Sequence, residues 1–162
     1  MSNARNLARL LPDAGGKLNT NNMASGSVLQ VVNVAFNGAL TSTSTTYSDT
    51  GLTATITPKF ANSKILVMVD QTGCEKEVAS MQLLLKIQRN GVDLVGMEQY
   101  GGAATSSVGM VNFGSCTASY LDSPNTTSPL TYKTQYACSS AGRVYVQQAG
   151  GTSEMTLMEI AA

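Results

Sequence analysis

Apolar and polar side chains alternate along much of this chain, and the alternation is clearest at residues 81–89. The apolar positions with a spacing of two are Met81, Leu83, Leu85 and Ile87. A period of two is typical of a strand with one buried face, because successive side chains point to opposite sides of a sheet. Asn90 and Gly91 follow, and this dipeptide favours the positive φ angles of a two-residue hairpin turn. The pattern therefore predicts a strand that folds straight back into residues 92–95.

Short apolar runs separated by turn residues continue along the chain from residue 27. Residues 65–69 are apolar at every position, so we predict a central strand covered on both faces. Short strands separated by turn residues, without a long helical pattern, predict an all-β fold, an antiparallel β-sandwich. The side chains that we expect to fill its core are Leu83, Leu85, Ile87, Ile65, Val67, Val69, Tyr132, Tyr136, Val144 and Val146.

Residues 1–26 differ in composition from the rest of the chain. Leu7, Leu10 and Leu11 are spaced to share one face of a short helix, which would need a surface to pack on because so short a helix is unstable in water. Glycine, serine and asparagine dominate the residues that follow, as in a flexible linker. We predict an anchoring arm and linker at 1–26 and a β-sandwich domain at 27–162. A tail without fixed structure is the alternative.

The charges of the chain balance, with 10 basic and 10 acidic residues. No overall field would attract nucleic acid or an anionic membrane, so we predict neither as a partner. The segment before residue 28 holds Arg5, Arg9 and Lys17 against Asp13, so it is net positive and the remainder is net negative. A basic arm favours docking on an acidic protein surface, although so small an imbalance also arises by chance.

Candidate chemistry is sparse. The chain has no histidine, which excludes a Ser-His-Asp relay and removes the commonest metal ligand. Cys74, Cys116 and Cys138 are widely spaced, which favours buried free thiols and assembly in a reducing compartment, with one bridge and a leftover thiol as the alternative. Glu75, Lys76 and Glu77 form a charge run that we place in a solvated loop. We predict no catalytic residues, no cofactor site and no metal site.

Several blocks together resemble a family of tailed-phage fibre and virion-surface domains, and their order is similar to the tumour-necrosis-factor-like jelly roll. The matching blocks are residues 6–12, 26–32, 47–52, 63–67, the 120–124 turn, 131–133 and 155–162. The resemblance implies that the sandwich at 27–162 is a jelly-roll domain. It also implies a homotrimer on the virion surface, assembled in the host cytoplasm. It implies a phage structural protein, either a capsid decoration protein or a head fibre, that binds other virion proteins such as the major capsid protein or a tail component.

Two other functions remain open. A tail-fibre tip would bind a host receptor, such as a surface glycan, through loops at 101–109 and 122–129. A carbohydrate-directed enzyme is the alternative of another class, and it is disfavoured because no paired carboxylates stand out in the sequence.

Two sets of residues are candidates for binding other proteins. The virion-anchoring set is Arg5, Leu7, Arg9, Leu10 and Leu11. The candidates for the trimer interface are Met155, Leu157, Met158, Ile160, Tyr132 and Tyr136. The segment 155–160 is included because it is apolar on both faces, which is more apolar surface than the edge of a monomer should expose.

Overall fold

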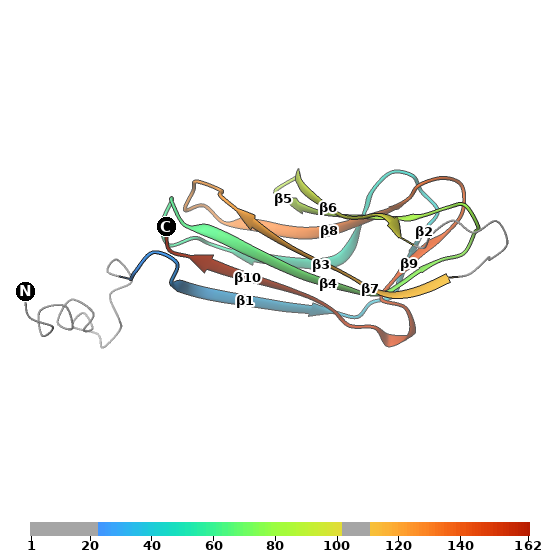
Figure 1. Cartoon of the computed structure of the whole chain (residues 1–162), viewed down its shortest axis with the longest axis horizontal. Helices are drawn as coiled ribbons and strands as arrows, with labels where there is room; N and C mark the ends of the chain where they lie inside the picture. The colour runs from blue at the N-terminus through green and yellow to red at the C-terminus, as the bar shows by residue number, and fades with distance from the viewer. Residues whose placement is uncertain (1–22, 102–110) are drawn as a thin grey trace, which may run out of the picture.

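The computed structural model describes residues 23–101 and 111–162, which form two antiparallel sheets packed face to face (Figure 1). The first sheet has the order β1-β10-β4-β9-β2, and β7 pairs with the other edge of β4. Its strands are β1 (Val28–Phe36), β2 (Leu40–Ser42), β4 (Lys64–Lys76), β7 (Val111–Asp122), β9 (Val144–Val146) and β10 (Ser153–Ile160). We call this sheet the outer-row sheet, because its outer face carries a row of apolar side chains at Val31, Met158, Leu66 and Leu121.

The second sheet has the order β3-β8-β5-β6. Its strands are β3 (Ser48–Ile56), β5 (Leu83–Arg89), β6 (Val92–Gly101) and β8 (Leu130–Cys138), and a short 3-10 turn, η2 (Gln148–Gly150), connects β9 to β10. Apart from the short strands β2 and β9 and the β5–β6 hairpin, which stays within one sheet, successive described strands alternate between the two sheets, and the first lies beside the last. This is the strand order of a jelly roll, which confirms the predicted fold class.

The predicted hairpin is present between β5 and β6. Asn90 and Gly91 form its turn with φ angles of 47° and 87°. The strand begins at Leu83 and not at Met81, although Met81 is also fully buried. The local sequence pattern therefore predicted the turn correctly and misplaced only the start of the strand.

The core lies between the sheets and is filled by alternate side chains of nearly every long strand. All ten side chains predicted to be buried are buried, and none of them is more than 4% exposed. A polar group interrupts this apolar core: the Gln71 amide donates a hydrogen bond to Ser153 Oγ (2.9 Å) and accepts one from the Thr134 hydroxyl (2.9 Å). These bonds join β4 and β10 of one sheet to β8 of the other.

The charge run at residues 75–77 was predicted to be a solvated loop, which is wrong for Glu75 and Lys76, whereas Glu77 follows the strand and its side chain is 40% exposed. Glu75 and Lys76 are the last residues of β4, and both pair with β7 and β9. The Lys76 side chain is fully buried. The alternation of inward and outward side chains continues past the apolar segment of β4, and Lys76 falls on an inward position. A charged residue type alone predicts a solvent-exposed position instead.

Candidate interaction surface

Neither a metal centre nor a membrane-spanning helix is found in the described residues. They contain no group of three or more histidine, cysteine or acidic side chains placed to hold a metal ion. No helix among them is long and apolar enough to cross a membrane. The surface feature that stands out is the outer face of the outer-row sheet, which points away from the core.

Strand register aligns four apolar side chains across this outer face. Val31 of β1 pairs with Met158 of β10, Met158 pairs with Leu66 of β4, and Leu66 pairs with Leu121 of β7. Val31 is 55% exposed and Leu121 is 50% exposed, while the two central side chains are half-buried. We call these four residues the outer apolar row. Single exposed apolar residues are ordinary on protein surfaces, but a continuous row across four strands is a candidate contact surface.

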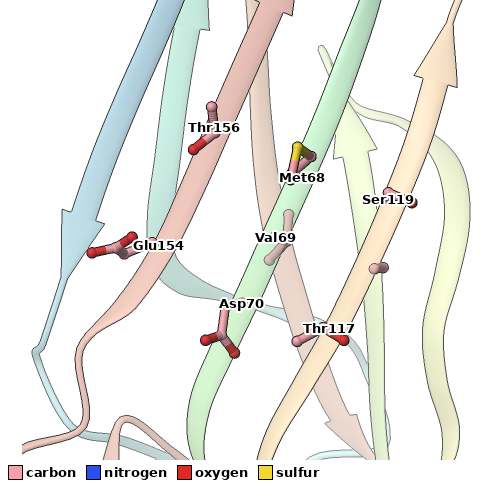
Figure 2. A pocket seen from close by; sticks show the side chains of 8 residues that line it. Met68, Val69, Asp70, Thr117, Ser119, Glu154 and Thr156 are labelled. Carbon is pink, nitrogen blue, oxygen red and sulfur yellow. The ribbon is translucent and has the colours of Figure 1, made fainter.

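An open pocket of about 490 Å³ lies beside the outer apolar row, over β10, β4 and β7 (Figure 2). Its lining residues are Met68, Val69, Asp70, Thr117, Ala118, Ser119, Glu154 and Thr156. Asp70 and Glu154 are directly paired across β4 and β10, and both side chains are exposed. Like charges in this position destabilise a sheet, and in the described part of the chain neither carboxylate has an ion-pair partner. The pocket therefore presents two acidic groups to a binding partner.

The structure confirms that residues 65–69 lie in a central strand, because β4 pairs with β10 on one side and β7 on the other. The prediction that both faces are covered is wrong for the described chain. The second sheet covers only the inner side, which leaves Met68 43% exposed on the outer face.

Four of the six trimer-interface candidates are side chains of the subunit's own core. Met155, Leu157 and Tyr132 are fully buried and Tyr136 is 3% exposed, so they have no surface to offer a neighbouring subunit. Met158 and Ile160 lie on the opposite, outer face of β10 and are half-buried. Strand alternation sends positions 155 and 157 inward and positions 158 and 160 outward, so Met158 and Ile160 are the candidates with outward-facing side chains, and a trimer interface stays a prediction.

The virion-anchoring candidates Arg5, Leu7, Arg9, Leu10 and Leu11 lie outside the described residues. The structure does show where their segment joins the domain. The Gly26 amide donates a hydrogen bond to the Ala161 carbonyl (2.8 Å), and the Ala161 amide donates one to the Ser27 carbonyl (2.9 Å). The arm is therefore attached beside the end of β10, on the sheet that carries the outer apolar row.

Sequence reasoning missed a buried ionic cluster, because it treated Asp122 only as part of a turn. Arg89 Nη1 donates a hydrogen bond to Asp122 Oδ2 (2.5 Å), and the Tyr132 hydroxyl donates a second to the same oxygen (2.7 Å). Burial, together with the Asp122 carboxylate, raises the pKa of Tyr132 above its usual value. The cluster joins β7 to β5 and β8 of the other sheet, so it stabilises the sandwich. The cluster can be identified only from the positions of Arg89, Asp122 and Tyr132 in the folded chain.

No protein-family model matches this chain, and no curated protein matches its sequence. Among solved structures, the chain is similar to the VP2 protein of the infectious bursal disease virus subviral particle, with a TM-score of 0.50 and 12% sequence identity. The alignment covers 82% of this chain and 32% of the VP2 chain, so the protein spans about a third of the chain that it matches. The infectious bursal disease virus Gt strain structure aligns with a TM-score of 0.40 and 12% identity, over 86% of this chain and 39% of that one. At this identity the likeness to VP2 establishes a shared β-sandwich fold.

Proposed function

We propose that this protein is a non-enzymatic structural component of a virus particle, and that the outer face of the outer-row sheet contacts another subunit. The observation that carries the proposal is the outer apolar row, a continuous apolar stripe that nothing in the described chain covers. The fold shared with a virus particle protein supports it, as does the resemblance to phage virion-surface domains. In its finer form, the protein is a homotrimeric phage capsid decoration protein or head fibre, held on the virion by the arm.

The energetics suit repeated contacts between subunits. Fully burying one large aliphatic side chain is worth roughly 1.5–3 kcal/mol, and the four members of the row start half-buried or more exposed. Association costs roughly 4–15 kcal/mol in lost freedom of motion, so a single row gives a weak contact. A closed trimer forms three interfaces at the cost of two associations, whereas an open pair forms one interface at the cost of one association. A closed trimer is therefore favoured over an open pair joined by the same interface.

We expect Val31→Glu to dissociate the assembly. A carboxylate in the outer apolar row would lose its hydration on contact, which should weaken association about 100-fold, equivalent to about 3 kcal/mol. The matched control is Val92→Glu on the β5–β6 hairpin, because Val92 is 58% exposed and Val31 is 55% exposed. Light scattering at micromolar concentration should give the trimer mass for the wild type and for Val92→Glu, and the monomer mass for Val31→Glu. A monomeric wild type, or equal effects of the two substitutions, would contradict the proposal.

Removal of residues 1–25 should separate assembly from attachment. We expect the truncated protein to form trimers of normal mass, because the outer apolar row remains, and to be absent from purified particles. Three leucines on each of three arms would bind by avidity, while Arg5 and Arg9 would set orientation and encounter rate. Normal incorporation of the truncated protein into particles would refute the anchoring role.

The pocket beside the row favours a second candidate function, receptor binding at a tail-fibre tip. The carboxylates of Asp70 and Glu154 and the hydroxyls of Thr117 and Thr156 are groups that hydrogen-bond to sugar hydroxyls. Particles that lack the whole protein distinguish the two functions. A capsid decoration protein predicts normal adsorption to host cells, whereas a receptor-binding tip predicts its loss.

A further inference from the structure

Two of the three cysteines lie next to each other on adjacent strands. Cys74 is near the end of β4 and Cys116 is in β7, and the register of these strands shifts on both sides of Cys74. Both side chains belong to the same buried core cluster. The Cys74 thiol donates a hydrogen bond to the Gln71 carbonyl (3.2 Å), and Gln71 is the register partner of Cys116. The irregular register therefore brings together two thiols that are more than forty positions apart in sequence.

Cys138 belongs to the same core cluster and has different partners. Its thiol donates hydrogen bonds to the carbonyl oxygens of Ser42 (3.3 Å) and Gly142 (3.6 Å). All three cysteines are free thiols in the structure. The chain thus supplies an internal control, a third buried thiol that lies in β8 of the other sheet.

The two paired thiols differ in access and in acidity. Cys74 is fully buried, whereas Cys116 is 8% exposed. Gly114, which pairs with Cys74, borders open space, because a Cβ atom added there would have no neighbour within 4 Å. The neighbouring Cys74 thiol lowers the pKa of the Cys116 thiol despite its burial, and Cys116 raises the pKa of Cys74. Cys116 is therefore the thiol suited to react first and Cys74 the one suited to complete the bond.

We propose that Cys74 and Cys116 are an oxidative modification site that closes to a disulfide across β4 and β7 when the protein meets a low-molecular-weight disulfide such as oxidised glutathione. The Cys116 thiolate attacks one sulfur of glutathione disulfide, which forms a mixed disulfide and releases one glutathione thiolate. Cys74, losing its proton to solvent, attacks the Cys116 sulfur and releases the second glutathione. The two thiols are oxidised by two electrons, and one glutathione disulfide is reduced to two thiols.

The bond would tie the edge strand β7 to the central strand β4. It would close a loop of about forty residues, which shrinks the unfolded ensemble, and it should raise Tm by roughly 10 °C. The chemistry does not depend on the proposed virion role. If that role holds, the protein would stay reduced during assembly in the cytoplasm and close the bond after release to oxidising surroundings.

The experiment uses the full chain, equilibrated with oxidised glutathione or with a reducing agent, then unfolded in acid and labelled with a thiol-alkylating reagent. We expect one label after oxidation and three after reduction, with peptide mapping that links Cys74 to Cys116. Cys138→Ala should still form the bond and show the same shift in Tm between the two conditions. Cys74→Ala and Cys116→Ala should lose both the bond and the shift.

Three results would overturn the proposal: three labels after equilibration with oxidised glutathione, a link that includes Cys138, or a glutathione adduct on Cys116 that never resolves. Should an alanine variant fail to fold, the Cys138→Ala chain and the wild type still decide the question by the position of the link. The outcome is also separate from subunit assembly, because the link is mapped within one chain and the oligomer mass is measured independently.

Discussion

Asp122→Ala is expected to lower the free energy of unfolding by about 3–5 kcal/mol, because it removes the shared acceptor of a buried ionic cluster. The side chain of Asp122 is 6% exposed, and that of Arg89 is 23% exposed. Without the carboxylate, the partly buried guanidinium keeps its charge and loses its partner, and the buried Tyr132 hydroxyl loses its acceptor. Urea unfolding followed by circular dichroism gives the free energy.

Asp49→Ala is the matched control for that measurement. Its carboxylate binds the Lys133 ammonium at 2.9 Å, but the Asp49 side chain is 51% exposed and surface ion pairs contribute little. The expected loss is about 1 kcal/mol or less. Equal losses for the two variants would show that the Asp122 cluster is no more important to the sandwich than an ion pair at the surface.

Gly73→Ala is expected to destabilise the fold by more than about 3 kcal/mol, from backbone strain and steric overlap together. Gly73 has a φ of +56°, and a Cβ atom built there would lie 2.3 Å from the backbone nitrogen of Gln148. Backbone of η2 cannot move aside easily, since the Gln147 amide donates a hydrogen bond to the Thr72 carbonyl at 2.9 Å. The thermal midpoint of unfolding measures the effect.

Gly114→Ala isolates the conformational part of that cost. Gly114 has a φ of +78° and no atom within 4 Å of its Cβ position, so alanine there should cost about 1–2 kcal/mol of strain alone. If both substitutions lower the thermal midpoint equally, the close approach of η2 to β4 does not contribute to stability.

The elements that sequence reasoning placed correctly depend on near neighbours in the chain. The hairpin at Asn90 and Gly91 follows from the backbone preferences of two residues, and the buried face of β5 follows from a period of two. The β-sandwich follows from many such segments, because strands with one apolar face need a second sheet to cover it. The jelly-roll order was predicted from the resemblance to virion-surface domains.

The sequence pattern alone did not identify which residues form the candidate surface. In β10 both faces are apolar, so the sequence could not distinguish Leu157, which packs in the core, from Met158, which lies in the outer apolar row. The arm residues lie outside the described structure, and their anchoring role stays a prediction.

Alternation and turn chemistry along the chain determined the strands, the hairpin and the ten core side chains, since each depends on the few residues around it. Tertiary structure alone decided the partners of distant residues. It joined Asp122 to Arg89 and Tyr132, set Cys74 beside Cys116, buried Lys76 and aligned Val31 with Leu121. The physical reason is that sheet order and register arise from cooperative packing of all the strands, and a one-residue slip in register moves every side chain of a strand to the other face.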